Sequence, residues 1–355
     1  AGILGLGNHH YKGHLWWKKD TWSIKNPADV NGGVNHFGSP FNFPEEFVTV
    51  YRLHALLPDR IDVRDWHDPN RIVSEVPIAS TLLANATTAM NKYGLADWAL
   101  SFGRQRLGAL ALQNSPRFLQ HLPMPRLGPG KTIDVVALDI VRDRERGVPR
   151  FNEFRRQYGL REFTSFDELT ENAELAAKLR SIYGQHRCDA SKIISDAQKD
   201  INDCLGHPDG SMVDNIEDLD TFVGWHAEGR RPHGFAISET QFQVFILNAS
   251  RRLFSDRFFT SSFRPEFYTS FGVHWVNYNG PGGRMYESKK QNGHRVEVSL
   301  LKRILMRTIP ELQPELAHVV NAFDPWARDH GTYYSTDWKP RPDAASDPAF
   351  KSDPR

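Results

Sequence analysis

The stretch FPEEFVTVYRLHALLPDRI, at residues 43–61, constrains the fold most because its apolar residues recur at helical spacing. Pro44 suits the first turn of a helix, where its missing N–H needs no partner, and the two glutamates after it suit the positive end of the helix dipole. Apolar and aromatic side chains then follow three or four residues apart, and Pro58 ends the run. The sequence therefore predicts a helix over residues 43–57 with one apolar face.

Tyr51 and His54 lie three residues apart in this predicted helix. A helix places such a pair on one face, with Cβ atoms about 5–6 Å apart. An imidazole can ligate iron, and a phenol close to a haem can be oxidised to a radical, so the pair indicates haem-driven radical chemistry. Taken alone, a tyrosine and a histidine on an apolar face are more often ordinary core residues.

Helical periodicity continues along most of the chain, and few segments alternate with period two, so the fold class is mainly α. We predict a turn-rich segment at 58–78, a loop at 206–214, and helices at 79–121, 133–146, 151–159, within 165–205, at 215–229 and at 236–256. These segments make up one α-helical domain over residues 43–336. Residues 1–42 read as an irregular N-terminal segment, and the Pro- and Asp-rich residues 337–355 as a disordered tail.

Composition excludes several classes of protein. The 355 residues carry 44 Lys and Arg against 43 Asp and Glu, which gives no basic excess for binding nucleic acid. Cys188 and Cys204 form neither a disulfide framework nor a zinc site, and so small a number favours an intracellular, reducing setting. No apolar run reaches the roughly 18 residues of a membrane span. The chain starts at Ala1 with neither an initiator Met nor a signal segment, which indicates a fragment or a processed chain.

Two local motifs do not support the functions they suggest. The segment PRLGPGKT, at residues 125–132, is not a phosphate-binding loop, because the position five before Gly130 is Pro125 and not glycine. Asn85 and Asn248 begin Asn-x-Ser/Thr sequons, but Asn248 lies within an apolar helical run where a glycan would not fit. Both sequons are therefore interpreted as chance matches.

Three segments carry a resemblance to a known family. They are VYRLHALLPD at 50–59, ALDIVRDRERGVPRFNEFRR at 137–156, and GFAISETQFQVFILNASRRLFSDRFFTSSF at 234–263. The first resembles the proximal-histidine helix of α-dioxygenases and cyclooxygenases, and the second the Arg-x-Arg-Asp-x-Gly-x-Pro-x-Tyr-Asn element of the animal-type haem peroxidase superfamily. The third is similar to a late helix of the α-dioxygenase branch, whose members oxygenate fatty acids. The resemblance covers residues 41 to 326 and implies a haem peroxidase-like helical domain.

One residue separates the branches of this superfamily. Its peroxidases carry an Arg three positions before the proximal His, whereas this chain has Tyr51, as do cyclooxygenases and α-dioxygenases, in which a tyrosyl radical takes hydrogen from a fatty acid. Fungal diol-synthase dioxygenases share the Tyr but carry Trp before the His. Leu53 stands at that place here and is nearer to the Met of plant α-dioxygenases, which favours α-oxygenation.

The resemblance assigns roles around the haem. His54 matches the proximal iron ligand, and Asp139 matches the acceptor of its second N–H, where a carboxylate in place of the peroxidases' amide would push more electron density onto iron. The alternative is that Asp139 is an exposed helix residue. Arg142 matches the Arg that pairs with a haem propionate.

The resemblance also implies a substrate site. Arg251 and Arg252 close an apolar helical run, where a guanidinium can bind a fatty-acid carboxylate, and Arg252 is the better candidate by its match to α-dioxygenases. The alternative is that both solvate a helix end or pair with Asp256. A fixed carboxylate would place C2 beside the Tyr51 radical, so that O2 adds there and gives a 2-hydroperoxy fatty acid.

Other family elements have no match. Nothing upstream of residue 41 resembles the distal His or the calcium loop of the family, so we expect a chain without the N-terminal distal half and with a haem cofactor. Calcium is possible in the family, but its loop is not seen in this chain. Residues 185–213 read as an insertion. The expected partners are a long-chain fatty acid and O2, with peripheral membrane association for access to substrate. The alternatives are a fungal-type 8/10-fatty-acid dioxygenase, a haem peroxidase that oxidises small donors, or a non-catalytic remnant.

Overall fold

Helices dominate the architecture, as the periodicity predicts. The computed structural model describes residues 43–105, 107–188, 209–229, 237–258, 261–279, 289–291, 294–296 and 300–317, with Val319 and Trp326. The α-helices in these ranges are α1 Glu45–Val50, α2 Asn85–Arg104, α3 Arg117–Gln120, α4 Val135–Arg146, α5 Phe151–Gln157, α6 Phe166–Leu169, α7 Ala173–Tyr183, α8 Thr221–Ala227, α9 Glu239–Ser255, α10 Pro265–Asn279, α11 Leu300–Thr308 and α12 Gln313–Leu316.

The strands pair only in short antiparallel hairpins. β1 (Arg60–Arg64) pairs with β2 (Ile72–Pro77), β3 (Leu122–Pro123) with β4 (Thr132–Ile133), β5 (Gln185–Arg187) with β6 (Met212–Asp214), and β7 (Lys289–Gln291) with β8 (His294–Val296). The rejected phosphate-loop segment 125–132 therefore belongs to the β3–β4 hairpin. The fold class of the described residues is mainly α.

Local signals explain why α4 and α9 lie where the sequence predicts them. The Asp134 side chain accepts hydrogen bonds from the backbone N–H groups of Val136 and Ala137 at the start of α4. Gly147 ends this helix in the left-handed conformation, with φ of 76°. Ser238 caps α9 by accepting from the backbone N–H of Gln241 at 3.3 Å.

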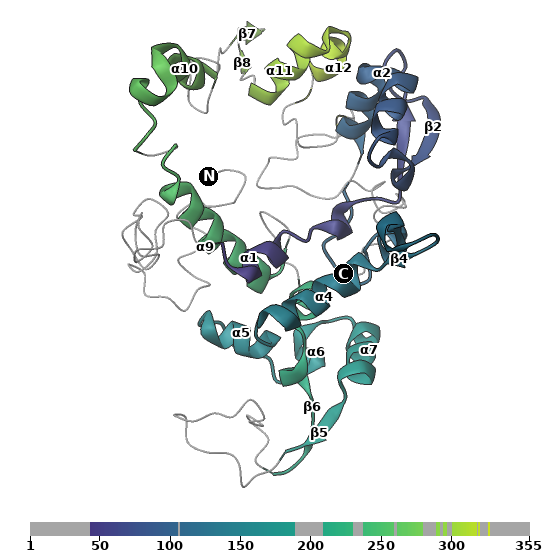
Figure 1. Ribbon diagram of the computed structural model, residues 1–355, viewed down its shortest axis with the longest axis vertical. Helices are drawn as coiled ribbons and strands as arrows, with labels where there is room; N and C mark the ends of the chain where they lie inside the picture. Colours follow the sequence, from purple (N-terminus) through teal and green to yellow (C-terminus); the bar gives the residue numbers. More distant parts are fainter. Residues whose placement is uncertain are drawn as a thin grey trace. The chain divides into compact units, whose positions relative to one another are not determined.

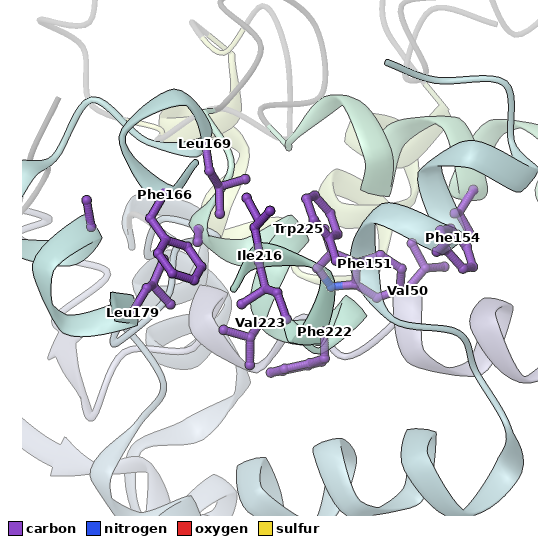
Figure 2. Packing of buried hydrophobic residues seen from close by; sticks show 14 of the residues in the cluster. Val50, Phe151, Phe154, Phe166, Leu169, Leu179, Ile216, Phe222, Val223 and Trp225 are labelled. Carbon is purple, nitrogen blue, oxygen red and sulfur yellow. The ribbon is translucent and has the colours of Figure 1, made fainter. Parts of the chain in front are cut away.

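The chain divides into two compact units, and the described part of the first unit lies within residues 43–56 and 109–260. Its core is built by apolar side chains from α1 and from α5 to α9. Figure 2 shows this cluster, with Phe151, Phe154 and Trp225 among its labelled members. Helix α1 packs along α9 and also contacts α4, and the three helices lie together in the ribbon of Figure 1.

A buried arginine ties three elements of this core together. Arg155, on α5, is 2% exposed and forms an ion pair with Glu228, whose carboxylate oxygen lies 2.8 Å away. The same guanidinium donates to the Thr240 hydroxyl at 2.6 Å near the start of α9. Because a buried charge is costly without partners, these contacts hold α5, the end of α8 and α9 together.

The described part of the second unit lies within residues 57–105, 107–108 and 261–326. The β1–β2 hairpin packs against α2 through buried Ile61, Val63, Val76 and Trp98. A separate cluster joins Leu100 of α2 to the segment around α12, and the Trp326 ring lies directly against Gly103. Gly94 interrupts α2 with a φ of 84°, which its lack of a Cβ permits.

Four predicted segments differ from the structure. The helix predicted over 43–57 ends at Val50, because Val48, Thr49 and Val50 form a β-branched run with low helix propensity and tertiary contacts then take over. Segment 58–78 contains the β1–β2 hairpin, and 206–214 contains strand β6. The helix predicted over 79–121 is α2 with the short α3, separated by irregular backbone.

Several other expectations concern residues that are only partly described. The segments 1–42, 189–208 and 337–355 lie outside the described residues. Cys188 is disulfide-bonded. Within the part of the chain that is described, no helix combines the length and apolar character needed to cross a bilayer.

Candidate functional site

Tyr51 and His54 do not share a helix, which corrects the expectation from their spacing. Tyr51 is the C-terminal cap of α1, and His54 begins a separate 3₁₀ turn over His54–Leu56. The backbone between them makes a tight turn, in which the Leu53 N–H donates to the Tyr51 carbonyl at 2.8 Å. Different helices therefore orient the two side chains.

His54 is oriented by α4. Its Nδ1 lies 3.6 Å from Oδ2 of Asp139, longer than a hydrogen bond but close enough for the carboxylate to face this edge of the imidazole. Burial lowers the pKa of His54, and the nearby Arg52 adds to this effect while Asp139 opposes it. The neutral imidazole, the form that binds metals, is thereby favoured.

Asp139 is a buried residue and not an exposed one, so the alternative considered for it is wrong. The residue is 3% exposed and its Oδ1 lies 2.9 Å from Nε of Arg52. Burial raises the pKa of Asp139, whereas Arg52, His54 and Arg142 lower it. The Asp139 carboxylate therefore faces both the imidazole of His54 and the guanidinium of Arg52, which lies two residues before His54 in the chain.

A second buried carboxylate lies one turn further along α4. Asp143 is 5% exposed, and the Thr49 hydroxyl of α1 donates to its Oδ1 at 2.5 Å. Burial raises the pKa of Asp143 to about 6, with a smaller contribution from the negative charge of Asp139. Together, Asp139 and Asp143 form the polar seam between α4 and the end of α1.

Arg142 lies next to these carboxylates on α4 and forms an ion pair with Glu45 at the start of α1. Its Nη2 donates to Oε2 of Glu45 at 2.6 Å, and both side chains are about one-third exposed. Arg146 adds a longer contact, 3.7 Å, to the other oxygen of Glu45. Arg142 therefore faces the start of α1 through an ion pair that the sequence did not indicate.

The Tyr51 ring is oriented by α1 and α9. It packs edge-on against Phe47, with ring centroids 4.9 Å apart, and lies 5.4 Å from the Phe245 ring. The side chain remains 47% exposed, so the phenol has an open side. Partial burial raises the pKa of Tyr51, which outweighs the opposing effect of Arg252, and the phenol stays protonated at neutral pH.

Arg252 lies on the same aromatic surface as Tyr51. Its guanidinium carbon is 4.1 Å from the centroid of the Phe47 ring and 5.0 Å from that of Phe43, distances typical of cation–π contacts. Phe47 thus contacts both the phenol and the guanidinium. The side chain of Arg251 lies outside the described side chains.

Sequence reasoning missed Arg52, Thr49 and Asp143. Arg52 and Asp143 had a local signal, since charged residues beside predicted ligands are candidates for orienting them. Thr49 had none, because its partner lies 94 residues away in the sequence. A buried histidine, His226, was also missed; burial lowers its pKa to about 4 and His54 contributes to the shift.

The described residues contain no group of three or more His, Cys, Asp or Glu side chains that could hold a metal ion. A single imidazole with a carboxylate behind it is instead the donor arrangement of a haem iron with one axial protein ligand.

The model of the animal haem peroxidase family matches residues 21–190 and 210–280 of the chain. The match begins before residue 41, where the sequence resemblance starts, and its gap falls within the predicted insertion at 185–213. Alpha-dioxygenase 2 of Arabidopsis thaliana is 34% identical over 304 residues, which cover 83% of this chain and 40% of that protein. The chain thus spans about two fifths of the length of this curated relative.

Solved structures of alpha-dioxygenases are also similar to this chain. The structure of Oryza sativa fatty acid alpha-dioxygenase is similar with a TM-score of 0.62 at 34% identity, covering 83% of this chain and 42% of that one. A tyrosine-to-phenylalanine variant of the same rice enzyme, solved with palmitic acid, is similar with a TM-score of 0.63 at 33% identity and covers the same shares of the two chains.

Proposed function

Because this chain belongs to the animal haem peroxidase family, we propose that it forms the proximal side of a haem-dependent fatty-acid α-dioxygenase. The observation that carries the proposal is the placement of His54 against buried Asp139, with Tyr51 close by in sequence on an open aromatic surface. The similarity to α-dioxygenases over 83% of the chain supports the choice of this branch.

The residues present fit a haem. The Nδ1 of His54 faces Asp139, which leaves Nε2 as the ligating atom, and the side chain is 26% exposed, so a ligand can reach it. Arg142, which is about one-third exposed and pairs with Glu45, is the candidate cation for a propionate. When bound, haem supplies the oxidising equivalent that generates a radical on the nearby phenol.

Tyr51 then acts as the hydrogen-transfer residue. Its phenoxyl radical takes a hydrogen atom from C2 of the fatty acid and becomes a phenol, and O2 adds to the carbon radical. The resulting peroxyl takes the hydrogen atom back from the Tyr51 phenol, which yields a 2-hydroperoxy fatty acid and restores the radical. A protonated phenol is needed for this cycle, and burial keeps the pKa of Tyr51 high.

Arg252 is proposed to bind the substrate carboxylate, with Arg251 as the neighbouring candidate. The guanidinium lies against Phe47, whose ring also contacts Tyr51, so a bound carboxylate would hold C2 near the phenol. A long acyl chain would continue over apolar surface. Positioning of the substrate, and not acid–base chemistry, would then select the α-carbon.

The decisive test is the Tyr51→Phe variant, measured by O2 uptake with palmitate and by mass analysis of the products. We expect loss of oxygenation with haem still bound, because only the phenolic O–H is removed. Tyr93→Phe, a change in the second unit, is the matched control and should retain activity. Palmitate-dependent O2 uptake by Tyr51→Phe would disprove the role of this residue.

The alternatives give different results in the same experiments. A peroxidase that oxidises small donors would turn over H2O2 with a phenolic donor independently of Tyr51. A fungal-type 8/10-dioxygenase would place the hydroperoxide in the middle of the acyl chain. A non-catalytic remnant would show no Soret band in the purified protein.

Association with a membrane surface belongs to the same proposal, since long-chain fatty acids partition into bilayers. Helix α10 supports it with strongly exposed aromatic side chains, among them Phe271 at 77% and Trp275 at 55%. Co-sedimentation with phosphatidylcholine vesicles, compared between the native chain and a Trp275→Ser variant, tests this association. Equal sedimentation of both would exclude α10 as the contact.

A further inference from the structure

Asn248 is a polar residue in the apolar middle of α9. It is 2% exposed, and a buried amide is costly unless its donors and acceptors are satisfied. Its Nδ2 donates to the Val244 carbonyl at 3.0 Å and to the Tyr158 hydroxyl at 3.4 Å. Its Oδ1 accepts a hydrogen bond from Nη1 of Arg252 at 3.3 Å.

Asn248 contacts Arg252 twice. Besides the side-chain contact, Nη1 of Arg252 donates to the Asn248 backbone carbonyl at 2.9 Å. These two bonds hold the guanidinium one turn back along α9, where it packs against Phe47. An arginine side chain has many rotamers, so fixing one of them reduces the entropy lost when a ligand binds.

The other side of Asn248 is anchored to different elements. The Tyr158 ring stacks on Phe154 of α5 with centroids 4.7 Å apart, and its hydroxyl lies 3.5 Å from Oε1 of Glu46 on α1. A continuous series of contacts thus runs from α1 through Tyr158 and Asn248 to Arg252. The amide is neutral, so it orients the guanidinium without neutralising its positive charge.

We propose that Asn248 is a positioning residue that aligns Arg252 for the carboxylate of an acyl substrate and so determines which carbon lies beside Tyr51. This inference rests on the proposed function. It adds a residue whose buried amide neither contacts the reacting atoms nor ligates iron. Its loss should therefore change the binding of the carboxylate and the position of oxygenation.

The test compares the haem-loaded native chain with an Asn248→Leu variant, using palmitate and 1-hexadecanol, which lacks the carboxylate. We expect the Kd for palmitate to rise about tenfold in the variant, corresponding to about 1.4 kcal/mol. The Kd for hexadecanol should stay unchanged. Mass analysis of the oxygenated products should show hydroperoxide at C3 and beyond as well as at C2.

An Asn248→Asp variant provides a second measurement, because its carboxylate would pair with Arg252 and compete with the substrate. Palmitate binding should fall further than in Asn248→Leu. The matched control is Gln243→Leu, a change at another buried amide of α9, nine positions before Arg252. Circular dichroism shows whether each variant keeps its helices, and Asn248→Thr replaces any that does not fold.

The outcomes separate the two proposals. A native chain that binds haem but not palmitate would overturn the proposed function, and this inference with it. A native chain that binds palmitate, with an Asn248→Leu variant equal to it in Kd and product position, would overturn only the inference. Equal weakening for palmitate and hexadecanol would also overturn it, because a structural defect affects both ligands.

Discussion

Single residues on α4 have partners that their sequence neighbours do not reveal. Asp139 faces His54 and Arg52, whereas Asp143, one turn later, accepts a hydrogen bond from Thr49. Burial raises the pKa of Asp143 to about 6, above the value near 4 of an unfolded chain. Between these values the folded state binds the extra proton, so the stability associated with Asp143 is lost as pH rises through this window.

The Asp143→Asn variant tests this linkage. Its amide oxygen can still accept from Thr49, but the side chain no longer ionises. The free energy of unfolding of the variant minus that of the native chain should be about 2 kcal/mol larger at pH 7.5 than at pH 4.5. Urea unfolding at both pH values measures this gain. A gain of the same size for Asp68→Asn, an exposed control, would contradict the assignment.

At the scale of elements, helix ends were predictable where their signals were local. The Asp134 cap and Gly147 delimit α4, and the Ser238 cap starts α9, close to the predicted bounds. The end of α1 was predictable only in part, because the β-branched run at 48–50 is a local signal but the contacts that take over after it come from helices distant in the sequence. Arg52 had a local signal beside His54, but its partner Asp139 was identified only through the family resemblance.

Gly147 offers a prediction for α4. Its φ of 76° is strained for any residue with a Cβ, while the space around it is open. A Gly147→Ala variant should therefore lose about 1 kcal/mol of unfolding free energy from backbone strain alone. Thermal or urea unfolding measures the loss. Gly229→Ala is the matched control, since that site is also open but has no positive φ, and it should be close to neutral.

At the scale of the whole molecule, buried groups oppose each other in their dependence on pH. Burial raises the pKa of Glu228 to about 6, as for Asp143, and lowers that of His226 to about 4. Asp143 and Glu228 therefore add to the free energy of unfolding at low pH, and this contribution is lost as pH rises through about 4 to 6. His226 has the opposite effect, because its folded pKa lies below the unfolded value and its contribution to stability is lost as pH falls from about 6.5 to 4.

A His226→Met variant isolates the histidine term. The free energy of unfolding of the variant minus that of the native chain should be about 2.5 kcal/mol larger at pH 4.5 than at pH 7.5. The reason is that only the native chain has a buried imidazole to protonate as the pH falls. Chemical unfolding across this pH range measures the difference. If the two chains differ by the same amount at every pH, His226 is not the group responsible.

The early end of α1 has a consequence for how such a protein can evolve. Tyr51 is anchored through aromatic contacts to α9, whereas His54 is anchored through a carboxylate on α4. Because no common helix couples them, mutations on α9 can alter the surroundings of Tyr51, the proposed radical residue, while leaving those of His54, the proposed iron ligand, unaltered. Mutations on α4 can do the reverse, so under the proposed function product specificity and redox properties can change by separate paths.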